Sequence, residues 1–322
     1  MKLGIDIGGA NTKAATSNGK FTYSKYLPLW KGCDIAGTLR DIKKKAGKTD
    51  AVGVTITGEL ADCFASKKEG IGHIAGEVKK VFPEAVFYGS DGKFYPSAGD
   101  HHLLSASNWS ASARFIGCVH KDILFIDIGS TTTDIIPIVA GIPVAGLTDF
   151  QRLSRSELIY AGALRTNVAA LLRAVFLRDM AVRTASELFA ITADVNLILG
   201  HIGQKDYSCD TPDGARKTKA ASALRLARVV CCDLDELSRE EALEIAKQAY
   251  WSQVEDLKEG IATVSENYCI RRAAICGLGS FIAKDALDEL GFPYTYVGAG
   301  TDISHVFPAY AVAKLLEMEP IE

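Results

Sequence analysis

Gly-Ile-Asp-Ile-Gly-Gly-Ala-Asn-Thr-Lys at residues 4–13 recurs, with few changes, as Phe-Ile-Asp-Ile-Gly-Ser-Thr-Thr-Thr-Asp at residues 125–134. The offset is the 121 residues that separate Asp6 from Asp127. The same offset relates Ile5, Ile7, Gly8 and Thr12 to Ile126, Ile128, Gly129 and Thr133. An internal repeat is a signal about the architecture of the whole chain, and this one predicts two copies of one structural unit.

The residues that follow each motif repeat as well. After the first copy, a predicted strand at 12–16 leads to the turn signal Ser17-Asn18-Gly19 and a second strand at 20–27. After the second copy, residues 135–145 show the same pattern around the turn Ala140-Gly141. Each copy therefore predicts a strand, a tight polar loop, a strand, a turn and a strand. Because the hairpin is duplicated, we expect an α/β protein with two lobes.

The aspartate of each copy points to a metal site. Residues 123–128 are apolar except for Asp127, which predicts a strand buried on both faces. A carboxylate at the end of such a strand is costly without a partner. A hydrated magnesium ion is a suitable partner, because it binds through few carboxylates and several waters. We therefore expect Asp6 and Asp127 to hold Mg²⁺, directly or through water.

The loop after each aspartate has the composition of a phosphate site. Glycines let backbone N–H groups approach a phosphate closely, and hydroxyl and amide side chains add donors. Lys13 adds a cation to the first loop. A pair of ordinary hairpins with polar turns is the alternative. The residues expected to contact phosphate or a cofactor are Gly8, Gly9, Asn11, Thr12, Gly129, Ser130, Thr131, Thr132 and Thr133.

The rest of the chain alternates between helix and strand patterns before it becomes helical. We expect a helix at 34–46 and strands at 51–57 and 85–88, followed by helices at 157–177, 185–199, 217–230 and 239–267. A strand at 273–276, a helix at 281–290 and a strand at 294–297 precede a last helix that Ser304 could cap.

The segment Gly277-Leu278-Gly279-Ser280 joins one of these strands to a helix. A strand, a glycine-rich loop and a helix N-terminus can form an anion or nucleotide cradle from backbone N–H groups and the helix dipole. We expect Gly277, Gly279 and Ser280 to contribute to an adenosine site. The alternative is a simple turn.

Composition limits the classes of partner. The net charge of −3 and the pI near 6.1 argue against a nucleic-acid-binding protein that relies on bulk positive charge. No stretch reaches the roughly 18 apolar residues of a membrane span, and the N-terminus has no signal-peptide pattern. We expect a cytoplasmic protein that acts on small molecules, with no membrane partner. The sequence leaves its oligomeric state open.

The order of a first phosphate loop, a second phosphate loop and a late glycine-rich loop resembles the actin-like ATPase superfamily, and within it the hydantoinase A/oxoprolinase group. Lys13 stands where that group has an acid. The resemblance implies two ribonuclease H-like lobes, at residues 1–120 and 121–303, the second with a helical insertion. It also implies that the last helix, at about 304–322, packs back on the first lobe.

Three strings carry a closer resemblance: residues 4–15, Ser107-Asn-Trp-Ser-Ala-Ser-Ala-Arg114 and residues 125–136. They are similar to an archaeal and methylotroph family labelled as tetrahydromethanopterin-linked one-carbon transfer pathway proteins. Its members are implied to be transferases of methanofuran biosynthesis. That reaction joins (5-aminomethylfuran-3-yl)methyl diphosphate to the phenol of γ-glutamyltyramine and releases diphosphate.

This reaction assigns roles to the candidate residues. Lys13 and the two loops would stabilise charge on the departing diphosphate. The phenol needs a base, for which Asp134 and Glu59 are the candidates. Their structural alternatives are a loop cap for Asp134 and a surface turn for Glu59.

A predicted helix between the hairpins carries three further candidates. Trp109 is expected in the core rather than stacked on a substrate, and Arg114 could pair with a phosphate or a carboxylate. Asn108 precedes them on the same helix. Asp100-His101-His102 resembles a metal-binding string, but adjacent histidines on a strand point apart.

Two other functions remain open at this point. One is an ATP-dependent small-molecule kinase or ATPase of the same fold, which the late glycine loop favours and which would use ATP or ADP. The other is a non-catalytic nucleotide-binding protein. Fold alone does not choose among them.

Overall fold

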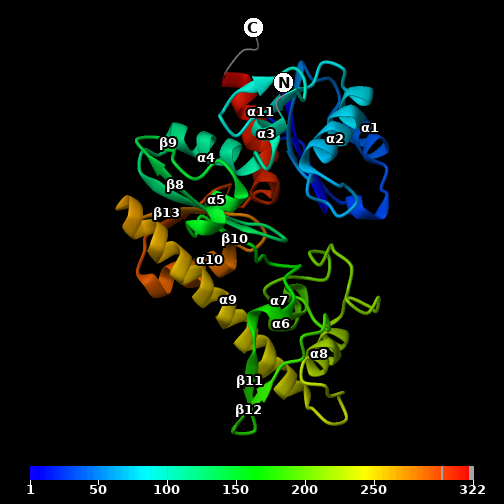
Figure 1. Cartoon of the computed structure of the whole chain (residues 1–322), viewed down its shortest axis with the longest axis vertical. Helices are drawn as coiled ribbons and strands as arrows, with labels where there is room; N and C mark the ends of the chain where they lie inside the picture. Colours follow the sequence, from blue (N-terminus) through cyan, green and yellow to red (C-terminus); the bar gives the residue numbers. More distant parts are fainter. Residues whose placement is uncertain (100, 299, 319–322) are drawn as a thin grey trace.

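The computed structural model describes residues 1–99, 101–298 and 300–318, without the side chain of His101, and contains two main sheets (Figure 1). The first sheet has the strand order β3-β2-β1-β4-β5-β6. Strands β1, β4 and β5 are parallel, and the hairpin neighbours are antiparallel. The strands are β1 (Lys2–Gly8), β2 (Asn11–Thr16), β3 (Thr22–Tyr26), β4 (Ala51–Thr57), β5 (Val86–Tyr88) and β6 (Phe94–Tyr95).

Two helices cover one face of this sheet. Helices α1 (Ile35–Ala46) and α2 (Lys67–Val81) pack against each other and contribute to one core with the buried strands. Both begin at a side-chain cap: Asp34 accepts a hydrogen bond from the Gly37 N–H, and Ser66 accepts one from the Glu69 N–H. The short helix η1 (Leu29–Lys31) precedes α1.

The second sheet has the order β10-β8-β7-β13-β14, with β9 paired to β8. Strand β7 is buried along most of its length, as its apolar sequence predicts. Helix α10 (Ser280–Leu290) and the long helix α9 (Arg239–Tyr268) pack on this sheet. The strands are β7 (Ile123–Ile128), β8 (Thr133–Val139), β9 (Ile142–Pro143), β10 (Leu158–Ile159), β13 (Ala273–Cys276) and β14 (Tyr294–Tyr296).

Two helices lie between the sheets. Helix α11 (Phe307–Met318) contacts β1, β4 and α4 (Asn108–Val119), and α4 also contacts β8 and β9. A Cβ atom on Gly4 would lie 1.9 Å from the Ala309 carbonyl oxygen, so only glycine allows α11 to approach β1 this closely. The boundary between the lobes at residue 120 stays a prediction.

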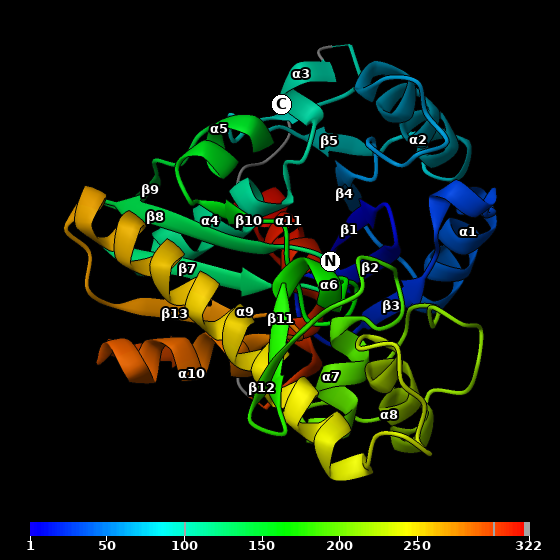
Figure 2. The same cartoon turned by 60° about the horizontal axis from the view of Figure 1, so that its bottom comes forward.

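An insertion projects from the second lobe (Figure 1). It contains the N-terminal part of α9 and a hairpin whose turn residues, Arg178 and Asp179, both have positive φ. Figure 2 shows the insertion beside β3, and the hydroxyl of Tyr26 donates to Asp210 at 2.8 Å. Its elements are α6 (Val168–Leu171), β11 (Ala174–Leu177), β12 (Met180–Arg183), α7 (Thr192–Leu199) and α8 (Lys219–Arg228).

The predicted helix at 157–177 is wrong. Leu158 and Ile159 form strand β10, which pairs with β8. The segment that follows β10 is hydrogen-bonded to the second phosphate loop. Ala163 N–H donates to the Gly129 carbonyl at 2.9 Å, and Leu164 N–H donates to the Ser130 carbonyl at 3.1 Å. These tertiary hydrogen bonds replace the local helical ones, so the periodicity misleads here. The helix predicted at 185–199 is also too long, because α7 begins at Thr192.

The predicted cap at Ser304 is wrong as well. Residues Asp302–Val306 form the short helix η2, and α11 begins at Phe307. The Ser304 hydroxyl instead accepts a hydrogen bond from the Gly277 N–H at 3.2 Å.

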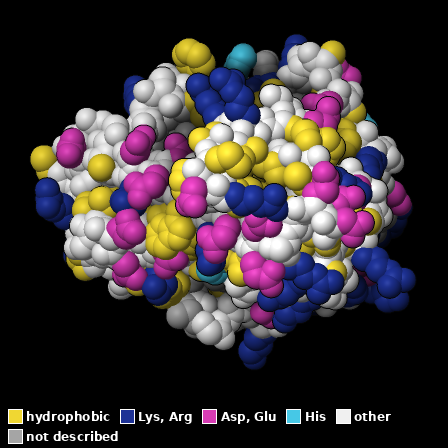
Figure 3. Space-filling model, turned by 90° about the horizontal axis from the view of Figure 1, so that it is seen from below, with side chains coloured by type: hydrophobic (Ala, Val, Ile, Leu, Met, Phe, Trp, Pro, Cys, Tyr) yellow, Lys and Arg dark blue, Asp and Glu magenta, His cyan; other side chains and the backbone are white. Residues whose placement is uncertain are grey.

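The remaining helices are short. They are α3 (His101–Leu104) and α5 (Asp149–Ser154). In the described part of the chain, no helix is both long enough and apolar enough to cross a bilayer. Figure 3 shows one face of the molecule, on which acidic and basic side chains are interspersed.

Candidate active site

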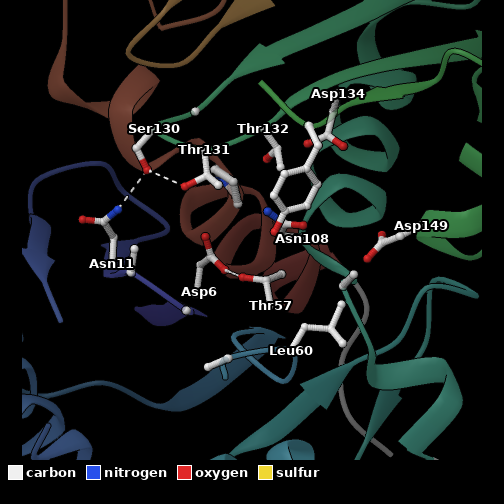
Figure 4. Close-up of a pocket in the computed structure, with 18 of the residues that line it drawn as sticks. Asp6, Asn11, Thr57, Leu60, Asn108, Ser130, Thr131, Thr132, Asp134 and Asp149 are labelled. Carbon is white, nitrogen blue, oxygen red and sulfur yellow. Dashed lines mark hydrogen bonds between the residues drawn. The ribbon is translucent and has the colours of Figure 1, made fainter. Parts of the chain in front are cut away.

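The loops of the two hairpins face one pocket of about 420 Å³ (Figure 4). The pocket brings together most of the residues that the sequence predicts for the site. These are Asp6, Gly8, Gly9, Asn11, Lys13, Glu59, Asp127, Gly129, Ser130, Thr131, Thr132 and Asp134. Asn108 also lines it.

The two loops touch each other through their side chains. Asn11 Nδ2 donates to Ser130 Oγ at 3.0 Å, and Ser130 Oγ lies 3.4 Å from Thr131 Oγ1. This bridge joins residues 119 positions apart in the chain. The hydroxyl and amide donors of both loops therefore converge on one place.

The register of the strands shows that the repeat is structural. Asp6 on β1 lies opposite Lys13 on β2, and Asp127 on β7 lies opposite Asp134 on β8. Lys13 and Asp134 thus occupy the same position in the two hairpins. The two halves of the pocket differ in charge at this position.

Asp6 and Asp127 are costly anions in this position. Burial raises the pKa of Asp6, opposed by the charge of Lys13 and by hydrogen bonds from Thr57 and Thr55. Burial also raises the pKa of Asp127 to about 6, again opposed by Lys13. A cation between the loops would offset this cost.

Asp134 has a fixed cationic partner. Arg152, on α5, forms an ion pair with Asp134 and a second with Asp149, the latter at 2.7 Å. The Arg152 guanidinium lies 4.8 Å from the centre of the Trp109 ring. Burial raises the pKa of Asp134, and Arg152 opposes this shift. Asp134 is therefore one partner of a buried ion pair. The sequence alternative, in which Asp134 only caps the loop, does not include this partner.

Glu59 differs from Asp134 because it forms no ion pair with the residues that the structure describes. It lies just after β4 and is 2% exposed, so it is not in a surface turn. Oε1 accepts a hydrogen bond from Ser105, while Oε2 is buried and has no hydrogen-bond partner among the described residues. Burial raises the pKa of Glu59, and the Ser105 hydrogen bond opposes the shift. Since Glu59 lines the pocket, Oε2 is an unsatisfied acceptor close to the pocket wall.

Sequence reasoning missed Arg165. Its Nη1 donates to Thr131 Oγ1 at 3.2 Å, and its guanidinium lies 4.7 Å from the centre of the Trp30 ring. Arg165 and Trp30 both line the pocket, so their contact joins the second lobe to the first lobe across it. Because residues 157–177 were predicted to form a helix, Arg165 was not expected near the second phosphate loop. Gly162 lies within that stretch and is unfavourable inside a helix, so it was a signal against the prediction.

Two predicted phosphate contacts do not reach the pocket. Thr12 is fully buried, and its hydroxyl has no hydrogen-bond partner in the part of the chain that the structure describes. The Thr133 hydroxyl is buried and donates to the Ala161 carbonyl at 2.7 Å. Both threonines face the interior of their lobes, because side chains alternate along β2 and β8.

The late glycine loop also lies outside this pocket. The Gly277 N–H donates to Ser304, the Gly279 N–H to the Ile128 carbonyl, and the Ser280 N–H to the Gly277 carbonyl. In this structure, all three N–H groups therefore donate to groups within the protein. Gly277 has a φ of +89°, and a Cβ there would lie 2.4 Å from Asp127 Oδ1. In this conformation the loop makes room for the Asp127 carboxylate.

The other candidates have structural surroundings. Trp109 is 3% exposed and belongs to a core cluster, as expected. Arg114 lies against Gly92, between β5 and β6, and does not line the pocket. Asp100 and the side chain of His101 lie outside the described residues, and His101 begins a helix instead of lying on a strand.

Within the described ranges, no group of three or more His, Cys, Asp or Glu side chains is arranged to hold a metal ion. Two facing carboxylates are nevertheless enough for Mg²⁺, which keeps most of its waters. The donor set therefore suits a hydrated cation better than an all-protein cage.

Comparisons with known proteins show the family of the chain. The family model described as hydantoinase/oxoprolinase matches residues 50–319. A (4-{4-[2-(γ-L-glutamylamino)ethyl]phenoxymethyl}furan-2-yl)methanamine synthase from Methanocaldococcus jannaschii is 41% identical over 99% of this chain and 98% of its own length. A protein of the same name from Methanococcus vannielii is 40% identical over 62% of this chain and 93% of its own length.

Solved structures support the fold. A ROK-family glucokinase from Streptomyces griseus matches with a TM-score of 0.50 at 12% identity, covering 99% of both chains. A nucleotide-free acetone carboxylase matches with a TM-score of 0.51 at 14% identity, over 90% of this chain and 46% of that one. The predicted two-lobed actin-like fold is confirmed.

Proposed function

The chain belongs to the hydantoinase/oxoprolinase family and to the group of (4-{4-[2-(γ-L-glutamylamino)ethyl]phenoxymethyl}furan-2-yl)methanamine synthases, and we propose that it forms the aryl ether of that product. The name of the product describes a phenol oxygen joined to a methylene group on a furan ring. The reaction condenses (5-aminomethylfuran-3-yl)methyl diphosphate with the phenol of γ-glutamyltyramine and releases diphosphate. The enzyme is a transferase of methanofuran biosynthesis.

One structural observation carries the proposal. The two phosphate loops line one pocket together with Glu59, whose buried Oε2 has no hydrogen-bond partner among the described residues. The first feature suits a diphosphate leaving group, and the second suits a phenol that must lose a proton. A single pocket therefore holds groups for both halves of the reaction.

We place the diphosphate between the hairpin loops. Asn11, Ser130 and Thr131 are already linked there and present donors. Lys13 and Arg165 are the cations of this part of the pocket. As the bond to the leaving group breaks, negative charge grows on the diphosphate, and these groups stabilise it more strongly than they stabilise the bound substrate.

We assign Mg²⁺ to Asp6 and Asp127, directly or through water. Both carboxylates line the pocket, and burial makes each of them costly without a cation. When bound, the ion would supply positive charge against the diphosphate oxygens.

Between the two candidate bases, we choose Glu59. Asp134 is held by Arg152, so taking a proton would weaken a buried ion pair. Oε2 of Glu59 has no such partner, and burial makes its ionised form more basic. Asp134 then acts as a positioning residue, which fixes Arg152 beside the pocket.

These groups account for the proton, the new bond and the leaving group in ether formation. The furan ring stabilises positive charge on the methylene carbon, so the bond to diphosphate can lengthen before attack. Glu59 accepts the phenol proton at Oε2, the phenol oxygen bonds to the methylene carbon, and diphosphate leaves with the electron pair. Glu59 then releases the proton to solvent. No nucleotide takes part, and a cytoplasmic location remains part of the proposal.

The test is a mass-spectrometric assay of the purified protein with Mg²⁺, γ-glutamyltyramine and the aminomethylfuran diphosphate. Parallel tubes contain ATP in place of the diphosphate. We expect the coupled ether and free diphosphate without ATP. Formation of ADP and a phosphorylated acceptor, with no ether, would instead support a kinase.

A further inference from the structure

A second cavity of about 290 Å³ adjoins the active-site pocket. The two cavities share Ala106 and Asp149 in their walls. We call the second cavity the annex, and it is lined by Ser66, Lys67, Lys68, His102, Ser105, Ala106, Leu147, Thr148 and Asp149. The shared wall makes the annex an extension of the site.

The annex lies away from the diphosphate end. Figure 4 shows Asn11, Ser130 and Thr131 on one side of the pocket and Asp149 on the opposite side. Asp149 also lines the annex. A ligand that begins between the loops and passes Asp149 therefore enters it.

The annex carries charges of both signs. Lys67 and Lys68 are the first two residues of α2, so the positive end of that helix adds to their charge. Lys67 Nζ lies 3.9 Å from Asp149 Oδ2, while Oδ1 of Asp149 pairs with Arg152. A carboxylate beside the lysines and an ammonium beside Asp149 would both find opposite charges.

The annex is also coupled to the proposed base. Ser105 lines the annex and donates to Oε1 of Glu59, which lines the main pocket. A phenol that gives its proton to Glu59 is therefore next to the entrance of the annex. The remainder of the acceptor must lie beyond it.

We propose that the annex binds the α-amino-acid head group of the γ-glutamyl acceptor, with Lys67 and Lys68 on its carboxylate and Asp149 on its ammonium. This assignment rests on the proposed function. γ-Glutamyltyramine carries its phenol and its zwitterionic head at opposite ends, and the two cavities offer a base and a zwitterion site in the same order. The annex thus selects the glutamylated acceptor over tyramine.

The experiment compares γ-glutamyltyramine with tyramine as acceptors for the same diphosphate. The ratio of their kcat/KM values is measured for the wild type, for the double variant Lys67→Met with Lys68→Met, and for the charge-retaining pair Lys67→Arg with Lys68→Arg. Lys80→Met, in the last turn of α2 and outside both cavities, is the matched control.

We expect the double Met variant to lower this ratio about tenfold, because each charge-assisted contact at a partly exposed site contributes modestly. The loss should fall on the KM for γ-glutamyltyramine and leave kcat near its wild-type value. The Arg pair should restore the preference, and Lys80→Met should keep it.

Three results would overturn the assignment. A ratio that is the same in the double Met variant and the wild type would exclude the annex as the head-group site. A raised KM for the diphosphate donor, with none for the acceptor, would make the annex a phosphate site. If wild-type protein forms no ether from either acceptor, the proposed function fails, and the annex assignment fails with it.

Discussion

Replacing Glu59 with Gln tests the assignment of the base with little change in shape. The amide oxygen of Gln can still accept the Ser105 hydrogen bond, while the amide nitrogen takes the place of Oε2. Gln cannot accept the phenol proton. Since general base catalysis typically contributes about 100- to 10,000-fold, we expect kcat to fall at least about 100-fold.

The same variant should fold normally. Oε2 of the wild-type carboxylate is buried without a partner, so an unpartnered amide nitrogen replaces a group that is already costly. The free energy of unfolding near neutral pH should change by less than about 1 kcal/mol. A large loss of stability would mean that Glu59 is structural.

The pH dependence provides a second measurement. Burial raises the pKa of Glu59 in the folded protein above its ordinary value of 4.5. Protonated Glu59 therefore stabilises the fold below that ordinary value, and this contribution is lost as the pH rises through the folded pKa. As the pH rises above this ordinary value, thermal unfolding of Glu59→Gln should therefore lose less stability than that of the wild type.

Steady-state kinetics over this pH range decide the matter. The kcat/KM of the wild type should rise as Glu59 ionises, and the variant should lack this limb. A variant that keeps more than a third of the wild-type kcat, or keeps the rising limb, would refute the role of Glu59.

Further substitutions separate positioning, metal binding and packing. Asp134→Asn leaves Arg152 with one fewer buried partner and should cost about 3 kcal/mol in a denaturant titration, and an unchanged midpoint would contradict the buried ion pair. Asp127→Asn should abolish ether formation and its dependence on Mg²⁺ while thermal unfolding stays cooperative; activity in excess EDTA in the wild type would argue against the metal site. Gly4→Ala places a Cβ 1.9 Å from the Ala309 carbonyl and should cost about 3 kcal/mol or more, and a wild-type melting temperature would contradict the close packing of α11 on β1.

The sequence predicted the part of the site that the repeat encodes. The offset between Asp6 and Asp127 becomes an identical register in the two hairpins, with Lys13 and Asp134 at equivalent positions. Local composition was sufficient here, because strand, loop and strand are adjacent in the chain. The loop residues that line the pocket follow from the same pattern.

The residues that sequence reasoning missed depend on tertiary structure. Arg152 contacts Asp134 because the chain returns to β8 through α5 and β10, and no local sequence pattern predicts that contact. Arg165 belongs to a segment whose backbone binds the second loop instead of forming a helix. Gly277 has a φ of +89°, and a Cβ there would lie 2.4 Å from Asp127 Oδ1, a close approach that the local sequence does not predict. The role of this loop in an adenosine site stays a prediction.

Labelling the phenol oxygen of γ-glutamyltyramine with ¹⁸O tests the central claim most directly. If the phenol attacks the methylene carbon, all of the label appears in the ether product, and the released diphosphate is unlabelled. A labelled aryl phosphate or aryl diphosphate would show attack at phosphorus and contradict the account.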